Sequence, residues 1–496
     1  MAAPSPSAPQ DRKDATSAVV EPAVPRVTLR NCFAHPYDSA IAAARTCYAP
    51  RLIAPEEITD KQRTTIGAAT FYAGHHTVYQ HAHFEFGIEN VSRQFVWSLL
   101  HAHPFYNSEQ QSQRYVRLDR ALAHVPDMSN LFGAEKIFTS AVARAWGAYR
   151  DLTTLLQVDA RAILADIWHL SSFSHPKRAE KVERQAEKKA IEVARYVLPE
   201  AAATTMVHTV SGIVLHRLWR MHAASDTPTE ARTIVGQMVA RVREVDPQFF
   251  DRFNDGPLVD LPEWAEAPDG GETQAREFDA QLAGRTSVLL DYSPAAPRVL
   301  AQSYRAVVGV SEVACSDAEA LDRMLNPARN PYRLETLNVG VHAPLMRPLL
   351  VLTDTRAPDF LTPMLIKSNA RAREIYERAM ADVWQAKNEL LDRGVPREFA
   401  LYLLPNAKAI RLVESGSLLH LLHKWTMRTC FNAQEEIYQA SMEEVDQVRA
   451  AMPELARYVG PPCYLRANVA TPICTEGSHF CGIKVWQEFP SVERRL

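Results

Sequence analysis

The segment 107–115 carries the densest set of side chains that could bind a nucleotide. It reads Asn-Ser-Glu-Gln-Gln-Ser-Gln-Arg-Tyr, which combines amides, hydroxyls and one permanent cation. Ser112 and Arg114 can donate several hydrogen bonds to a phosphate, and arginine can do so in a bidentate way. Gln110 and Gln111 can read the amide edge of a planar base such as a pyrimidine. By composition alone, a solvated polar loop remains the alternative.

Two groups of residues have side chains that bind metals. The first group consists of His75, His76, His81, His83, His101 and His103. Neutral imidazoles bind Zn²⁺, but no cysteine accompanies these histidines and no HExxH motif occurs. The second group, Cys463, Cys474, Cys481 and His479, could form a structural Zn²⁺ site, yet it lacks a CxxC pair. We therefore predict no metal, and whether Cys463, Cys474 and Cys481 bind one stays open.

Composition and charge are those of an ordinary globular protein. Of the 496 residues, 47% are hydrophobic, and 55 basic against 58 acidic side chains give a net charge of −3. Such a chain has no overall field for binding nucleic acid or an anionic membrane, so neither partner is predicted. Seven cysteines in so long a chain do not make a disulfide framework. With no secretory signal and no long apolar run, we expect a cytoplasmic protein.

An internal repeat organises the chain. Residues 192–247 align without a gap on residues 398–453, an offset of 206, and 17 of the 56 positions are identical. The identities include the pairs Leu198/Leu404, Pro199/Pro405, Ser211/Ser417, Trp219/Trp425, Met221/Met427, Glu230/Glu436 and Pro247/Pro453. Shared Trp, Pro and Met at fixed spacing are not a product of composition, so we infer two copies of one domain.

The repeat sets the expected domain boundaries. We predict a disordered tail at 1–27, copy one at 28–256, a linker at 257–284 and copy two at 285–496. Helical spacing of apolar residues predicts helices within 363–393, 415–429 and 434–452. Alternating segments at 81–91 and 345–354 predict strands. Long helices with short strands indicate an α+β fold rather than a regular βα alternation.

Copy one resembles the flavin-dependent thymidylate synthases. The family signature is Arg-His-Arg, seven residues and then a Ser within S-x-R-Y, preceded by G-H-x-S/T-x-x-E-H and V-S-R. The corresponding residues are Gly74, His75, Thr77, His81, Phe84, Phe86, Val91, Ser92, Arg93, Ser112, Arg114 and Tyr115. The segments 43–48 and 194–199 in copy one and 418–437 in copy two are also similar. The resemblance implies two tandem family domains, each with long helices and a small mixed sheet.

The chain departs from the signature in a complementary way. His101-Ala102-His103 replace the Arg-His-Arg that holds the flavin in the family, and eight residues instead of seven precede Ser112. Imidazoles are largely neutral at pH 7, so permanent charge is lost. Elsewhere each copy keeps a different arginine of the family. Copy one keeps Arg195, where copy two has Leu401. Copy two keeps Arg428, where copy one has His222.

This complementarity suggests a site shared between the copies. The resemblance implies homotetramers whose sites combine residues of several subunits, so a homodimer of this chain would act as a pseudo-tetramer. Copy one would supply Ser112, Arg114 and Arg195, and copy two would supply His423, Arg428 and Gln434. The alternative for Arg428 is a charge at the C-terminal end of its own helix.

The resemblance also implies an activity. It is the FAD-dependent reductive methylation of dUMP to dTMP, with methylenetetrahydrofolate and NADPH as co-substrates. The residues implied are Arg195 and Arg428 as catalytic, Gln110, Gln111, Ser112 and Arg114 for the substrate, and His75, Thr77, His101, His103 and His423 for the flavin. Two alternatives stay open: a flavin or nucleotide enzyme acting on a modified pyrimidine, and a degenerate, non-catalytic binding partner.

Overall fold

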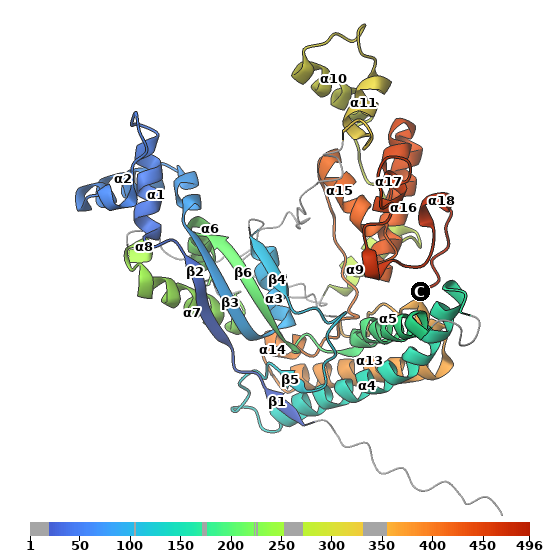
Figure 1. The fold of residues 1–496 in the computed structure, drawn as a ribbon. Helices are drawn as coiled ribbons and strands as arrows, with labels where there is room; N and C mark the ends of the chain where they lie inside the picture. The colour runs from blue at the N-terminus through green and yellow to red at the C-terminus, as the bar shows by residue number, and fades with distance from the viewer. Residues whose placement is uncertain are drawn as a thin grey trace, which may run out of the picture.

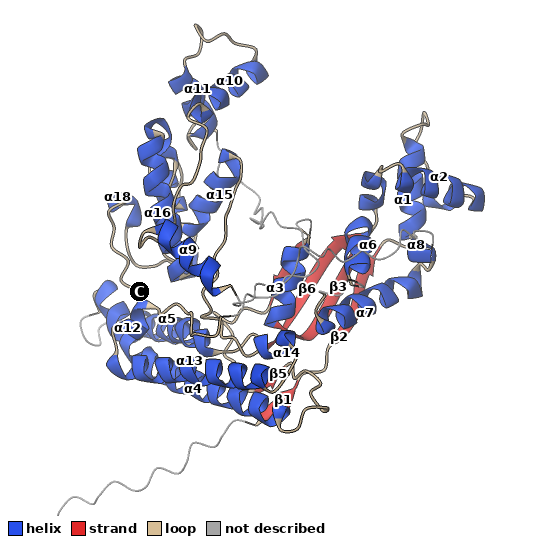
Figure 2. Ribbon diagram, turned by 180° about the vertical axis from the view of Figure 1, so that it is seen from behind, coloured by secondary structure: helices blue, strands red, loops and turns tan. Residues whose placement is uncertain are grey.

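The molecule has a sheet-containing half, a layer of long helices and a second, helical half (Figure 1). The structure, a computed structural model, describes residues 19–103, 106–170, 176–222, 224, 227–251, 271–330 and 355–496. Figure 2 shows from behind that the strands lie on one side of the molecule and that the other side consists of helices.

The sheet of copy one is antiparallel, with strand order β2-β3-β6-β4. Its strands are β2 (Arg26–Cys32), β3 (His83–Ser92), β6 (Ala203–Ser211) and β4 (Asn107–Gln110). Alternate residues of β3 (Phe84, Phe86 and Ile88) are fully buried, as expected for one face of a strand packed on a core. The helices of this half are α1 (Pro36–Thr46), α2 (Asp60–Tyr72), α3 (Arg93–Ala102), α6 (Gly212–Met221), α7 (Thr229–Val245) and α8 (Gln248–Asp251), with 3-10 helices η1 (Pro55–Glu57) and η2 (His76–His81).

The layer of long helices joins the two copies through one core. It contains α4 (Ala134–Ile167) and α5 (Pro176–Ala194) from copy one, and α12 (Met364–Lys367), α13 (Ala370–Asp392) and α14 (Arg397–Leu401) from copy two. On α4 the buried residues Trp146, Tyr149, Leu152 and Leu156 recur every three or four positions, which places them on one face. Buried side chains of both copies pack against one another in this core, so the two copies share a single hydrophobic core here.

The end of the predicted tail differs from expectation. A short strand β1 (Val20–Pro22) pairs in parallel with β5 (Ala121–Ala123), and β2 begins at Arg26. The partner strand lies about a hundred residues away in the sequence, so local composition gave no sign of the pairing.

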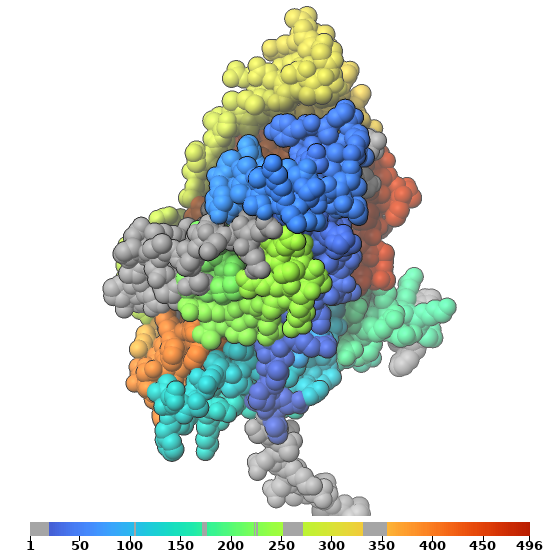
Figure 3. All heavy atoms as spheres, turned by 90° about the vertical axis from the view of Figure 1, so that its left-hand side faces the viewer, coloured from blue at the N-terminus to red at the C-terminus, as the bar shows by residue number. Residues whose placement is uncertain are grey.

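The second half is helical throughout its described residues. Its elements are α10 (Ala296–Val308), α11 (Asp317–Leu325), α15 (Leu418–Arg428), α16 (Glu435–Ala451), η6 (Pro453–Tyr458), α17 (Pro462–Arg466), η7 (Gly477–His479) and α18 (Val485–Glu488). Apart from η7, these elements contribute side chains to a third hydrophobic core. In the side view of Figure 3, α10 and α11 project beyond the rest of the molecule.

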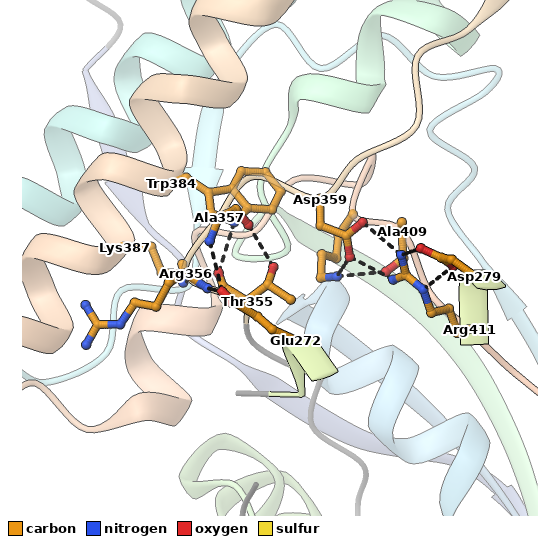
Figure 4. A network of polar contacts seen from close by, with 11 residues as sticks. Glu272, Asp279, Thr355, Arg356, Ala357, Asp359, Trp384, Lys387, Ala409 and Arg411 are labelled. Carbon is orange, nitrogen blue, oxygen red and sulfur yellow. Dashed lines mark hydrogen bonds and ion pairs between the residues drawn. The ribbon is translucent and has the colours of Figure 1, made fainter. Parts of the chain in front are cut away.

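The predicted linker contains a helix, α9 (Glu272–Leu282). A Glu272 carboxylate oxygen accepts a hydrogen bond from the Arg356 backbone N–H at 3.0 Å, and Asp279 pairs with Arg411 at 2.7 Å (Figure 4). Arg411 also pairs with Asp359 at 2.8 Å. The predicted linker thus contains a helix whose acidic side chains fasten it to copy two.

The two copies meet around a local twofold axis. Pro199 and Pro405, which are equivalent in the repeat, face each other in an antiparallel bridge. Four backbone hydrogen bonds surround them, from Glu200 N to Leu404 O (2.8 Å), from Asn406 N to Leu198 O (2.9 Å), from Ala201 N to Tyr402 O (2.8 Å) and from Ala407 N to Tyr196 O (3.0 Å). Shifting the first bond by the 206-residue offset gives the second, and shifting the third gives the fourth. Such pairs of equivalent hydrogen bonds are expected where two copies of one domain contact each other across a twofold axis.

Most of the predicted elements are confirmed. The three predicted helices appear as α12 with α13, as α15 and as α16, and the strand at 81–91 appears as β3. The strand predicted at 345–354 lies outside the described residues. The α+β class is confirmed, with parallel and antiparallel pairings in two separate sheets. None of the described helices has the length and apolar character needed to cross a membrane.

A buried histidine of β6 predicts acid sensitivity. Burial lowers the pKa of His208 from its ordinary 6.5 to about 4. The unfolded chain therefore binds this proton more readily, so stability is complete above pH 6.5 and falls as the pH drops towards 4, by about 3 kcal/mol in total. We expect His208→Phe to flatten the pH dependence of the free energy of unfolding between pH 7 and 4.5, measured with urea. The exposed His81→Phe serves as control, and an unchanged slope in His208→Phe would contradict the assignment.

Candidate functional site

The loop after β4 presents Arg114 towards the second copy. Within the loop the Ser112 carbonyl accepts hydrogen bonds from the Tyr115 and Val116 backbone N–H groups, and the Ser112 hydroxyl accepts one from the Arg114 N–H at 3.2 Å. This tight turn leaves the Arg114 side chain only 24% exposed. Its Nη2 donates to the Asn432 carbonyl at 2.7 Å and pairs with Glu192 at 2.9 Å. The segment 107–115 is therefore more than a solvated loop.

Arg195 also reaches the second copy. It lies where α5 passes into the 3-10 helix η3 (Arg195–Val197), and it is buried. Its Nη2 donates to Gln434 Oε1 at 2.6 Å, and Gln434 Nε2 donates to the Tyr196 hydroxyl at 2.9 Å. Tyr196 in turn donates to Glu436. Two arginines of copy one thus contact the turn between α15 and α16 of copy two, which is the arrangement that the cross-copy hypothesis requires.

Arg428 is the cation of this cluster that lacks a counterion. It is the last residue of α15, and it makes no hydrogen bond or ion pair with the described part of the chain, including the carbonyls at the end of its own helix. Partial burial and then the positive charge of Arg114 lower the pKa of Arg428. Two like charges from the two copies are therefore held close together, and a bound anion would remove the electrostatic repulsion between them.

The carboxylate of Glu192 is surrounded by positive charge. Burial by itself would raise its pKa, but Lys189, Arg114, Arg195 and Arg494 together hold the pKa of Glu192 below its ordinary value. The group stays ionised and orients Arg114. Glu192 and Tyr196 were not among the residues predicted for the site, although both are identical to their repeat partners, Glu398 and Tyr402.

The two glutamines predicted to read a base have different surroundings. Both side chains are exposed. Gln110 Oε1 accepts a hydrogen bond from Arg93, whereas the backbone N–H of Gln111 donates to the Thr205 carbonyl at 2.9 Å and continues the pairing of β4 with β6. Gln111 therefore keeps its amide available at the edge of the sheet.

The histidines predicted for the flavin are dispersed. His75 and Thr77 are exposed near η2, and His101 packs on Trp97 with ring centroids 4.0 Å apart. His103 is buried at the end of α3. His423 is buried on α15, in the other half of the molecule (Figure 1).

A cation absent from the prediction lies beside His103. Arg217 of α6 contacts His103 Nε2 at 3.1 Å and His76 Nδ1 at 3.4 Å. Among the described residues these imidazoles are its only partners, and no carboxylate there neutralises it. The available signal was the repeat itself, because Arg217 aligns with the predicted His423.

Comparisons with known proteins identify relatives of this chain. The sequence model described as "Thymidylate synthase complementing protein" matches residues 28–248 and 351–454. A flavin-dependent thymidylate synthase of Clostridium tetani is 29% identical over 45% of this chain and 85% of its own length. One of Nitratidesulfovibrio vulgaris is 30% identical over 46% and 85%. The solved UMP/dUMP methylase PolB of Streptomyces cacaoi, bound with 5-Br dUMP, has a TM-score of 0.35 at 15% identity over 47% of this chain and 96% of its own, too distant to support an argument.

Proposed function

Because the chain belongs to the flavin-dependent thymidylate synthase family, we propose that it methylates dUMP to dTMP with methylenetetrahydrofolate, NADPH and FAD. The observation that carries this proposal is the proximity of Arg114 and Arg428, contributed by different copies, with no counterion on Arg428 among the residues that the structure describes. A nucleotide phosphate dianion supplies the missing negative charge and joins the two copies at the site.

The remaining residues of the cluster position the nucleotide. The Ser112 hydroxyl lies in the same turn as Arg114 and can donate to the phosphate. Arg195, held by Gln434, adds a third permanent charge to the cluster of Arg114 and Arg428. Gln111 presents its free amide to the base. Binding a charged substrate between fixed donors orients it without reorganising the protein, which is the main contribution the chain makes to the reaction.

The surroundings of Arg217 fit the phosphates of FAD. The Arg-His-Arg charges of the family are missing, yet Arg217 restores a permanent charge directly beside His103, flanked by His76. His75, Thr77 and His101 lie on the elements next to it, and His423 would come from a second chain of a homodimer. When bound, the flavin supplies the hydride that completes the methyl group on uracil C5.

Arg217→Ala is expected to weaken FAD binding about 10- to 100-fold, because a charge-assisted hydrogen bond contributes about 1.5–3 kcal/mol. Quenching of flavin fluorescence on titration into the apoprotein measures this affinity without any turnover. Arg217→Lys keeps the charge and is expected to recover part of the affinity. If Arg217→Ala binds FAD as tightly as the unmodified protein does, the flavin phosphate lies elsewhere.

The activity is tested on the purified full-length protein. We expect a yellow flavin spectrum, release of tritium from dUMP labelled at C5, and one dUMP bound per chain by calorimetry. One site is expected because the second set of repeat positions carries Leu401, His222 and Pro228 in place of Arg195, Arg428 and Gln434. A colourless protein that takes up no added FAD would refute the proposal. Bound flavin without tritium release would instead favour a modified pyrimidine as substrate.

A further inference from the structure

Four of the seven cysteines converge on one small pocket in the second half. Cys430 follows α15, Cys463 lies in α17, and Cys474 and Cys481 lie in the loop before α18. All four line the same pocket, together with apolar side chains such as Phe431, Phe480 and Ile483. We propose that these four thiolates bind a metal centre. This metal site is separate from the proposed nucleotide and flavin sites, and its test requires neither ligand.

Contacts between the segments hold the cysteines in this arrangement. Asn432 Nδ2 donates to a Glu476 carboxylate oxygen at 2.9 Å and to the His479 carbonyl at 3.0 Å. These bonds tie the turn after Cys430 to the loop that contains Cys474 and Cys481. Cys463 approaches from a third segment, at the first turn of α17. Three stretches of chain thus bring their thiols to one place, and all of these cysteines are free of disulfides.

The pocket that the four cysteines share is lined mainly by apolar side chains. A metal centre binds cysteines as thiolates, and the positive charge of the metal stabilises that form in apolar surroundings.

The arrangement of the cysteines favours an iron–sulfur cluster over a single ion. Zinc requires all its ligand sulfurs at about 2.3 Å from one point. No group of three or more His, Cys, Asp or Glu among the residues that the structure describes is arranged to hold one ion. In a four-iron cluster each thiolate binds a different iron, so its cysteines stand farther apart. Four thiols that line one pocket without being arranged around a single ion match that requirement.

The metal centre would stabilise the turn after α15, which contacts Arg114 and Arg195 of the proposed nucleotide site. Cys430 is two residues from Asn432, whose carbonyl accepts the hydrogen bond from Arg114. Gln434, which holds Arg195, follows in the same turn. A metal bound to Cys430 fixes the start of this turn, so the proposed role is structural and needs no redox step.

The test is the metal and sulfide content of the full-length protein, purified without oxygen. We expect about four irons and four acid-labile sulfides per chain, lost in Cys463→Ala and in Cys481→Ala. The exposed Cys47→Ala is the matched control and keeps them. One zinc without sulfide would retain the four-thiolate site but refute the cluster. A protein free of iron and zinc, or a metal content unchanged in both variants, would overturn the proposal.

A second measurement does not depend on whether the variants fold. In the unmodified protein, alkylation followed by mass spectrometry is expected to label Cys47 and to spare Cys430, Cys463, Cys474 and Cys481. Removal of the metal with a chelator is expected to expose all four together. Labelling of the four that is the same before and after chelation would show that no metal protects them.

Discussion

Arg428→Ala is expected to weaken dUMP binding about 10- to 100-fold while leaving the melting temperature unchanged or slightly higher. The affinity falls because one charged donor to the phosphate is lost, worth about 1.5–3 kcal/mol. Stability does not fall, because Arg428 has no hydrogen bond or ion pair to lose within the described chain and its charge is disfavoured by burial and by Arg114. Calorimetric titration with dUMP and a thermal melt of the same sample measure the two quantities.

The comparison with Arg114→Ala separates substrate binding from structure. Arg114 bonds Asn432 and Glu192, so its removal is expected to lower both the dUMP affinity and the melting temperature. Arg184→Ala, an exposed arginine on α5, is the matched control and should change neither. If Arg428→Ala binds dUMP normally, or if it destabilises the protein as much as Arg114→Ala does, then Arg428 serves its own helix and the shared site is refuted.

Much of the architecture could be predicted because the repeat preserves the contacts between copies. Pro199/Pro405 and Tyr196/Tyr402 are identical in both copies because they form the two halves of one local twofold contact. The helix α9 could not be predicted in the same way. Its acidic residues meet partners more than eighty positions away, and nothing in the local sequence distinguishes them from a solvated linker.

The residues of the candidate site also divide into those that the sequence could identify and those that it could not. Arg114, Arg195 and Arg428 could be selected because they match a motif at fixed spacing. Arg217 matches no family motif, and its role depends on α6 bringing it against the end of α3, so only its alignment with His423 in the repeat pointed to it. Cys430 also escaped selection for metal binding, because its position beside Cys463 depends on how α15 and α17 pack. Residues whose role is created by tertiary contacts carry no local signal.

The repeat pair Glu230 and Glu436 shows how the two copies have diverged. Glu436 accepts a hydrogen bond from Tyr196 beside the nucleotide site. Its equivalent Glu230 is buried and accepts the equivalent bond from Tyr402 at 2.8 Å, together with bonds from the Ser92 N–H and hydroxyl. The second location has kept the contact between copies without the arginines, and we infer that its role is structural.

Glu230→Ala is therefore expected to lower the free energy of unfolding by about 3–5 kcal/mol, among the largest effects of any single substitution in this chain. The change leaves the Ser92 backbone N–H and the Tyr402 hydroxyl buried without their acceptor, and each such group costs about 1–3 kcal/mol. Urea unfolding followed by circular dichroism measures the loss. Glu244→Ala, an exposed carboxylate on the same helix α7, should cost less than about 1 kcal/mol. Equal losses in the two variants would mean that the junction between the copies does not depend on this buried carboxylate, and that the local twofold contact is held by its backbone hydrogen bonds alone.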